Sequence, residues 1–330
     1  MWNGRNGYHR RFRGSTAPQP DPAGAAAGRA EAVLSAALSS VDLLLVLTSA
    51  ALHAWWSVAI KGSGDPLCFN VLQELAPVAA LVAVAPLVEW GEVPRIVWML
   101  LAATGVTHGA YFFWMSRAYE HGDLSLVYPI ARSTPAFVPL VAAPLFGESI
   151  SPSGGAGIAI VVLGIWLVHG GRGAGLRELS SPAARFAYLT LVATVGYSLL
   201  DKAAMTHLAA ADWTSAIPRP VVYSLLIAGA NAVVFAPLAL RARGLPALRE
   251  AARTQLGRAT AASLVSFASY TLILAALQTA LVSYVVAARQ TSVLFAVGLG
   301  VALLGERPGL ARVTGALATV AGVALIAMAR

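Results

Sequence analysis

Residues 122–148 read GDLSLVYPIARSTPAFVPLVAAPLFGE, and this segment carries the main structural signals of the chain. It begins with the polar pair Gly122-Asp123, continues through more than twenty mainly apolar positions, and ends at Gly147-Glu148. An apolar run of this length predicts a helix that spans a membrane. The run nevertheless carries Arg132, about two turns into the predicted helix. Because a charge at that depth is costly in lipid, Arg132 indicates either a solute pathway or a pairing partner inside the protein.

Residues 281–306 repeat this plan, with Arg289 inside an apolar run that ends at Gly305-Glu306. A constant offset of 158 relates two sets of four residues: Gly147, Glu148, Gly157 and Gly164 recur as Gly305, Glu306, Gly315 and Gly322. An offset of 141 relates a second pair of motifs: Trp56-Ser57 with Lys61 recurs as Tyr197-Ser198 with Lys202. The chain therefore reads as two copies of one five-helix unit, over residues 40–170 and 184–330. Five is odd, so the second copy enters the membrane from the opposite side, and such inverted repeats are typical of secondary transporters.

The composition points to the same class of protein. Of the 330 residues, 58% are hydrophobic and only 12% are charged, and the mean hydropathy is +0.70. A soluble domain is about one quarter charged, so we predict an all-α polytopic membrane protein. The net charge of +8 indicates no nucleic-acid partner, because the basic residues lie mostly in loops and the N-terminal tail, where they set topology and contact lipid headgroups. The single cysteine, Cys68, excludes an intramolecular disulfide.

Ten segments are long and apolar enough to span the bilayer as helices. They cover residues 40–60, 67–89, 96–118, 124–146, 152–170, 184–206, 217–240, 259–279, 281–304 and 310–328. We expect a long polar loop over residues 241–258 and almost none between the eighth and ninth spans. Residues 1–38 are basic and rich in proline, and we predict a disordered tail.

Several of these motifs together resemble a known family. They are LHAWW at 52–56 before Lys61, RAY at 117–119, GDLSLVYPIAR at 122–132, and the two Gly-Glu closings. The chain resembles the EamA-type branch of the drug/metabolite transporter superfamily over roughly residues 40–330. The resemblance implies ten helices, a central cavity between the halves, and secondary transport or export of metabolites. One departure is that the second half has VVAAR at 285–289 where the first has YPIAR, so the Tyr128-Pro129 pair is not duplicated.

The two deep arginines are the leading candidates for substrate contact. Each lies about eight residues into its helix, roughly 12 Å from the membrane surface. A guanidinium suits an anionic substrate group, although it can equally hold helices together. Tyr128 lies one turn before Arg132 on the same helix face. Helical spacing adds polar residues that should turn away from lipid. The candidates from this spacing are His53 and Ser57, His108 and Tyr111, and Tyr197 and Ser198.

Three residues are candidates for energy coupling. His53 either carries protons, since its unperturbed pKa is near neutral, or is a hydrogen-bonded structural residue. Asp201 beside Lys202 is either a local charge pair near a helix end or a coupling site. The Gly-Glu closings and the glycines spaced by seven are predicted to be structural. Glu148 and Glu306 would lie near the positive ends of the following helices, and the glycines would allow close helix contact.

The distribution of basic residues leaves the orientation open. A cytosolic N-terminus would place nine basic residues on the cytosolic side and twelve on the other. This count favours an outside N-terminus, whereas the resemblance implies that both termini lie inside. We expect a multi-pass protein of the bacterial cytoplasmic (inner) membrane.

The sequence therefore predicts a secondary transporter that works by alternating access. Its substrate would be a small polar, anionic or zwitterionic metabolite, and its other partner membrane lipid. The alternative is an intramembrane enzyme or a flippase for a lipid-linked group. No His-Glu-x-x-His, Gly-x-Ser-x-Gly or nucleotide-binding loop occurs in the sequence, so we predict no enzyme, no metal and no cofactor. We expect a monomer or a homodimer.

Overall fold

The computed structural model describes residues 38–61, 63–121, 124–169, 178–304 and 309–329, and every regular element in these ranges is a helix. The predicted tail, Gly305 and Glu306 lie outside the described residues. The longer helices are α2 (Ser40–Lys61), α3 (Pro66–Gln73), α4 (Leu75–Val84), α5 (Arg95–His121), α6 (Leu124–Arg132), α7 (Thr134–Phe146), α8 (Pro152–His169), α9 (Pro182–Ala210), α10 (Arg219–Leu277), α11 (Val282–Ala288), α12 (Ser292–Leu304) and α13 (Leu310–Met328). Short 3₁₀ turns are η1 (Ala85–Leu87), η2 (Trp90–Glu92), η3 (Glu178–Ser180) and η4 (Arg289–Thr291).

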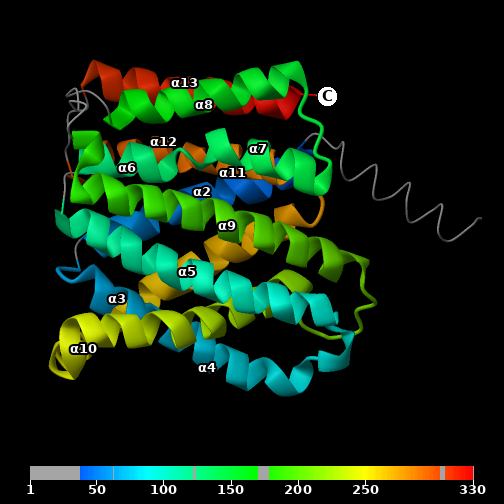
Figure 1. The fold of residues 1–330 in the computed structure, drawn as a ribbon, viewed down its shortest axis with the longest axis vertical. Coiled ribbons are helices and arrows are strands. Elements are labelled where there is room, and N and C mark those ends of the chain that lie inside the picture. The colour runs from blue at the N-terminus through cyan, green and yellow to red at the C-terminus, as the bar shows by residue number, and fades with distance from the viewer. Residues whose placement is uncertain (1–37, 62, 122–123, 170–177, 305–308, 330) are drawn as a thin grey trace, which may run out of the picture.

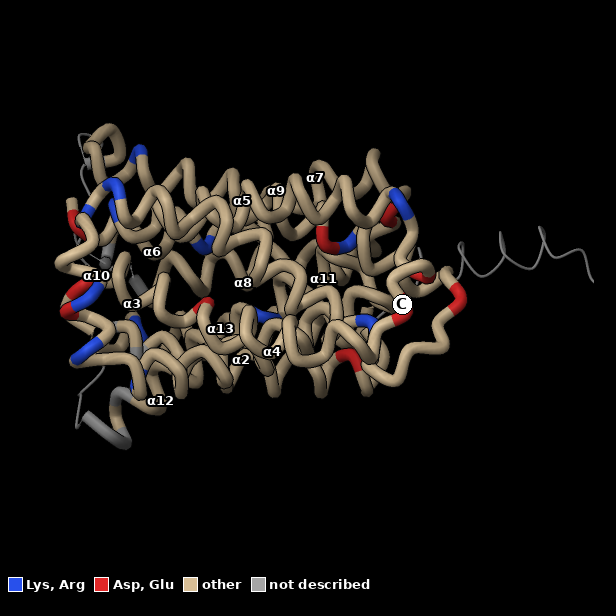
Figure 2. Tube along the Cα trace, turned by 90° about the horizontal axis from the view of Figure 1, so that it is seen from below, with Lys and Arg blue, Asp and Glu red and all other residues tan. Residues whose placement is uncertain are grey.

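The helices lie side by side in a layered bundle (Figure 1). The α8–α13 pair forms one outer layer, α6, α7, α11 and α12 lie beneath it, and α3, α4 and α10 lie at the far side. Charged residues gather at the two ends of the helices, with few between them (Figure 2). In the described residues, seven helical segments are long and apolar enough to cross a membrane. The chain is an all-helical, multi-pass membrane protein, and the count of ten spans stays a prediction.

Three of the predicted spans are broken near their middle. The second changes from α3 to α4 at Glu74, the fourth from α6 to α7 at Ser133, and the ninth from α11 to α12 through η4. Proline explains the first two breaks, because it has no N–H to donate four residues back. Pro77 leaves the Gln73 carbonyl without a helical donor, and the Ser263 hydroxyl bonds that carbonyl instead.

The break after Arg132 is built in the same way. Pro135 has no N–H to donate to the Ala131 carbonyl. That carbonyl accepts a hydrogen bond from the Thr134 hydroxyl instead, at 3.4 Å. The Ser133 hydroxyl donates to the Pro129 carbonyl at 2.7 Å. No proline lies in the ninth span, where η4 tightens the chain over the polar run Arg289–Thr291. The backbone groups freed at such breaks are tolerated in a membrane only where protein or a cavity surrounds them.

The predicted loop over residues 241–258 is wrong. Helix α10 is assigned across this region, with one non-helical residue, Gly244, at φ 80° and ψ 161°. The chain folds back at this glycine, which tolerates positive φ without a steric penalty. The arginines that suggested a loop are good helix formers, and Arg249 and Arg253 are exposed on the returning arm.

Glycines allow α8 and α13 to approach closely. A Cβ atom on Gly157 would lie 2.6 Å from the Gly322 carbonyl oxygen, and one on Gly164 would lie 2.7 Å from the Gly315 oxygen. The reverse contacts are equally short, at 2.6 Å for both Gly322 and Gly315. Ascending positions on α8 meet descending positions on α13, so the two helices are antiparallel. The role expected for these four glycines, close packing of helices, agrees with this geometry.

The short connection between α10 and α11 is held by charged side chains from three other segments. Lys202 donates to the carbonyls of Leu277 and Ala280, both at 2.8 Å. Asp42 accepts from the Thr279 hydroxyl at 2.7 Å. Glu148 accepts from the Val282 N–H at 2.6 Å and from Ser283. Glu148 therefore caps α11 from the other half of the chain rather than the next helix, α8, as the sequence suggested. Gly147 ends α7 with φ 68°.

Candidate functional site

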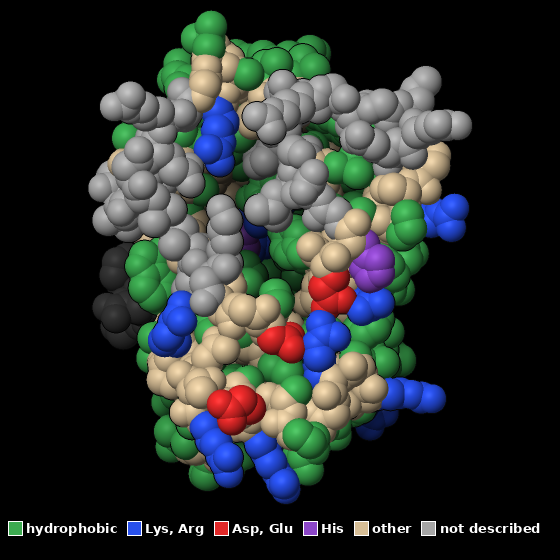
Figure 3. All heavy atoms as spheres, turned by 90° about the vertical axis from the view of Figure 1, so that its left-hand side faces the viewer, with side chains coloured by type: hydrophobic (Ala, Val, Ile, Leu, Met, Phe, Trp, Pro, Cys, Tyr) green, Lys and Arg blue, Asp and Glu red, His purple; other side chains and the backbone are tan. Residues whose placement is uncertain are grey.

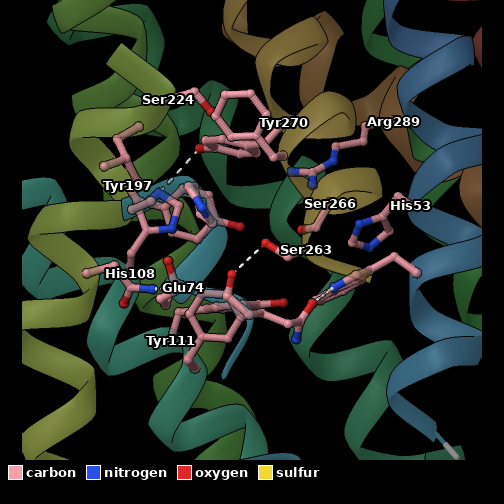
Figure 4. Close-up of a pocket in the computed structure, with 18 residues that line it drawn as sticks. His53, Glu74, His108, Tyr111, Tyr197, Ser224, Ser263, Ser266, Tyr270 and Arg289 are labelled. Carbon is pink, nitrogen blue, oxygen red and sulfur yellow. Dashed lines mark hydrogen bonds between the residues drawn. The ribbon is translucent and has the colours of Figure 1, made fainter. Parts of the chain in front are cut away.

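A cavity of about 110 Å³, lined by charged, polar and aromatic side chains, lies inside the bundle. Its walls come from α2, the α3–α4 break, α5, α9, α10 and η4 (Figure 4). The lining residues are His53, Trp56, Gln73, Glu74, Pro77, His108, Tyr111, Phe112, Tyr197, Ser224, Ile227, Ala228, Asn231, Ser263, Ser266, Phe267, Tyr270 and Arg289. A water needs roughly 10–15 Å³ of such space, so the cavity has room for several waters or a small polar solute. Figure 3 shows a hollow in one end of the bundle, with basic and histidine side chains visible at depth.

Arg289 lines this cavity from the break in the ninth span. Its guanidinium carbon lies 5.4 Å from the centre of the Tyr270 ring, and Figure 4 shows the side chain reaching toward the cavity beside His53. The buried Nε of Arg289 has no hydrogen-bond partner. None of the ion pairs found among the described residues includes this arginine. Arg289 thus lines the cavity and keeps one donor, Nε, without a partner among the described residues.

Arg132, which ends the YPIAR motif of the first half, does not line the cavity. Its Nη2 donates to His53 Nε2 at 2.6 Å, and its guanidinium carbon lies 4.9 Å from the Tyr128 ring centre. Because arginine cannot accept, His53 accepts through Nε2 and its ring is neutral in this contact. Arg132 therefore reaches the cavity through His53, whose ring also lies 4.9 Å from that of Trp56.

Asp201 is a fully buried hub behind the cavity wall. It accepts hydrogen bonds from Thr104 at 2.7 Å, from Tyr223 at 3.1 Å and from Tyr270. His108 Nε2 lies 3.3 Å from the second carboxylate oxygen. These contacts join α5, α9 and α10 and fix the Tyr270 ring on which Arg289 rests. Asp201 and Lys202 are not a local charge pair, because adjacent helix positions point in different directions and Lys202 binds the α10–α11 connection.

The remaining predicted residues separate into two groups. His108, Tyr111 and Tyr197 share the cavity wall: the His108 and Tyr197 rings stack at 4.1 Å, and Tyr111 meets Tyr197 edge-on at 5.6 Å. Ser57 and Ser198 do not line the cavity. Each donates instead to a carbonyl four residues earlier in its own helix, that of His53 or Thr194.

Sequence reasoning missed the side of the cavity that carries the acid. Glu74 accepts from the Asn231 amide at 2.7 Å, and both residues line the cavity with Tyr270 and Ser263. A signal was present: Gln73 and Glu74 are polar residues within a predicted span, and Pro77 follows one turn later. Within the described part of the chain, no three His, Cys, Asp or Glu side chains gather as a metal site requires.

The fold and site define a multi-pass helical membrane protein with a polar, charged cavity at its centre. The family model described as "EamA-like transporter family" matches residues 41–170 and 210–328. The chain therefore belongs to the EamA-like transporter family, whose members are membrane transporters of the drug/metabolite transporter superfamily.

Comparison with solved structures supports the fold alone. One of them, described only as "Crystal structure of protein", has a TM-score of 0.66 and 18% sequence identity, and the match covers 88% of this chain and 98% of that one. A search of curated proteins finds no match.

Proposed function

We propose that this protein is a secondary transporter that carries a small polar metabolite with an acidic group through the central cavity by alternating access. The observation that carries the proposal is Arg289, which lines the cavity with a buried Nε that has no partner. A guanidinium in a water-poor site binds a carboxylate strongly and can do so through two parallel hydrogen bonds. Charged residues within a membrane typically mark a solute pathway.

Alternating access requires two related halves, and the α8–α13 contact supports an inverted pair of five-helix repeats. Gly157 and Gly315 are equivalent under the sequence offset of 158, as are Gly164 and Gly322. Gly157 meets Gly322 while Gly164 meets Gly315, which is the pattern expected around a local two-fold axis. The α6–α7 break follows Arg132, and the α11–α12 break begins at Arg289. The similar places of these two breaks also support related halves. We count ten spans by adding α2 and α8 to the seven long apolar segments and by taking α10 as two spans about Gly244.

Segmented helices suit this function. Discontinuous membrane helices in secondary transporters carry the substrate site near the bilayer midplane. Glu74, Arg132 and Arg289 each lie at such a break. The resemblance to a bacterial branch of the family favours a place in the bacterial inner membrane and export as the direction of transport. The sequence has no nucleotide-binding loop, so the driving force would be exchange of solute or of protons.

Counterflow in proteoliposomes tests the proposal. Vesicles loaded with one member of a panel of amino, hydroxy and keto carboxylates are placed in the same radiolabelled solute, and its accumulation is followed. The wild type should accumulate at least one acidic solute, and Arg289→Gln should abolish the signal. Arg253→Gln, the same change at an exposed position of α10, should leave it unchanged. Absence of counterflow for every solute, or equal activity of both variants, would contradict the proposal.

A further inference from the structure

The acidic side of the cavity is built by the break in the second span. Glu74 stands between α3 and α4, where Pro77 interrupts the helix and Ser263 takes the Gln73 carbonyl. The break turns the Glu74 side chain into the cavity with Asn231. In Figure 4, Glu74 lies across the cavity from Arg289, with Ser263 and Ser266 between them.

Glu74 is an acid without a basic partner. None of the ion pairs found among the described residues includes it, and its carboxylate accepts a hydrogen bond from the Asn231 amide. Because that amide nitrogen faces the carboxylate, the Asn231 Oδ1 faces elsewhere, and it is buried with no partner. The Glu74 carboxylate and the Asn231 Oδ1 are both acceptors, whereas the Arg289 guanidinium on the other side of the cavity can only donate.

Aromatic rings complete the surroundings of this acid. Tyr111 and Phe112 line the cavity with Glu74 and meet edge-on, with their ring centres 5.2 Å apart. The face of an aromatic ring attracts a cation. An ammonium group has three N–H donors and no acceptor, so it matches a carboxylate and a free amide oxygen beside aromatic rings.

We propose that Glu74 and Asn231 form a subsite for the protonated amine of the transported solute. The solute is then a zwitterion, with its ammonium group at Glu74 and its acidic group at Arg289. This inference rests on the proposed transport function and narrows its substrate class. It also accounts for two opposite charges that line one cavity yet make no ion pair with each other: the solute supplies the counter-charge for each, which repays the cost of holding them in the membrane.

A series of ω-amino carboxylates of increasing chain length tests the proposal, because the chain length sets the distance between the amine and the carboxylate. Each is compared with the n-alkyl carboxylate of the same length, which lacks the amine. Binding to the purified full-length protein is measured by thermal shift, and transport by competition in counterflow. We expect one chain length to bind best, and every zwitterion near that length to exceed its matched carboxylate.

The variant Glu74→Gln keeps the shape and removes the charge. It should weaken binding of the best zwitterion at least tenfold, which corresponds to about 1.4 kcal/mol, and change binding of the matched carboxylate less than twofold. Glu250→Gln, at an exposed position of α10, is the control and should change neither. If Glu74→Gln yields no folded protein, Asn231→Thr tests the same subsite and should give the same selective loss.

Three results would overturn the inference. Equal losses for zwitterion and carboxylate in Glu74→Gln would assign the acid a structural role. Unchanged zwitterion binding in that variant would place the amine elsewhere. Carboxylates transported as well as zwitterions, with Glu74→Gln altering only the dependence on pH, would show that a proton alone occupies the subsite. In each case an intact effect of Arg289→Gln would leave the transport proposal standing, whereas no binding or transport of any acidic solute would overturn both.

Discussion

Arg132 and Arg289 end two similar sequence motifs, YPIAR at 128–132 and VVAAR at 285–289, yet their surroundings differ. Arg132 donates to His53 at 2.6 Å and stands behind that ring, outside the cavity lining. Arg289 lines the cavity, rests on Tyr270 and keeps a buried Nε without a partner. Arg132 holds a ring of the cavity wall, and Arg289 lines the cavity itself. Similar sequence motifs thus place an arginine inside each of these spans. The neighbouring side chains determine which contacts that arginine makes.

The four glycines of α8 and α13 show the opposite behaviour. They are also equivalent in pairs, but their contacts are nearly identical, with each Cβ position 2.6 or 2.7 Å from a carbonyl oxygen of the partner helix. The contacts of these glycines are reciprocal, whereas the surroundings of the two arginines differ.

The sharpest test of this contrast changes the two arginines alike. Arg289→Gln should weaken solute binding by about 2–3 kcal/mol, or about 30- to 150-fold, because it removes one partner of a buried charge contact. Arg132→Gln should cost about 1 kcal/mol, or about fivefold, because it disturbs the His53 and Tyr128 rings without removing a group that lines the cavity. Concentration-dependent counterflow measures both. Equal losses would show that the arginines act alike.

Matching changes in the glycines should give matching effects. Gly157→Ala and Gly315→Ala each place a methyl group 2.6 Å from a backbone oxygen, and each should destabilise the protein by about 1–3 kcal/mol through overpacking. Thermal unfolding in detergent compares them with the exposed-site control Gly257→Ala, which has open space around it. Clearly unequal losses at the two glycines would argue against a symmetric contact.

Asp201 connects the packing to the cavity, so its replacement should affect both. Asp201→Asn leaves the hydroxyls of Thr104, Tyr223 and Tyr270 with a weaker, neutral acceptor. We expect a loss of about 1–3 kcal/mol in stability and a smaller decrease in transport than Arg289→Gln gives, because Tyr270 is displaced beneath Arg289. Ser198→Ala, which removes only a bond within α9, should change neither thermal unfolding nor counterflow. A stable Asp201→Asn protein with normal transport would remove Asp201 from this role.

The smallest expected effect lies outside the cavity. Glu92 accepts from the side chain and N–H of Thr214 and from Ser215, joining the connections after α4 and α9. The Thr214 hydroxyl foremost, with the neighbouring backbone N–H groups, lowers the pKa of Glu92. A lowered folded-state pKa gives stability that is present above the unfolded value of about 4.3 and is lost as the pH falls through the folded value.

The small excess in Tm of the wild type over Glu92→Gln should therefore be constant near neutral pH and disappear in acid. Thermal unfolding across this pH range measures the difference. A difference that grows in acid would have the wrong sign.

Much of the fold could be predicted because long apolar runs, the Gly-Glu closings and the spaced glycines are local signals. The boundary between the two arms of α10 could not be predicted. Residues 241–258 are polar in composition, yet they are helical apart from a single glycine, Gly244. A polar composition indicates that a segment is exposed to water. It does not tell an exposed helix rich in arginine from a loop, because arginine is a good helix former.

The site was less predictable because it depends on contacts between distant segments. Helical spacing placed His53, His108, Tyr111 and Tyr197 on interior faces, and the depth of Arg289 in an apolar run indicated the same for it; all five line the cavity. The same spacing cannot tell a side chain that faces the cavity from one that bonds to its own helix. Glu74 escaped notice because its exposure to the cavity follows from the break at Pro77 and from Asn231, which lies 157 residues away along the chain.

Accessibility of the cavity from the two sides of the membrane tests alternating access most directly. Cys68 is the only cysteine, so Ser266→Cys in a Cys68→Ala background places a single thiol in the cavity wall. A membrane-impermeant maleimide is applied to right-side-out cells and to inside-out vesicles, with and without a transported solute. We predict labelling from both sides, with the solute slowing it. Labelling from one side only under every condition would contradict alternating access.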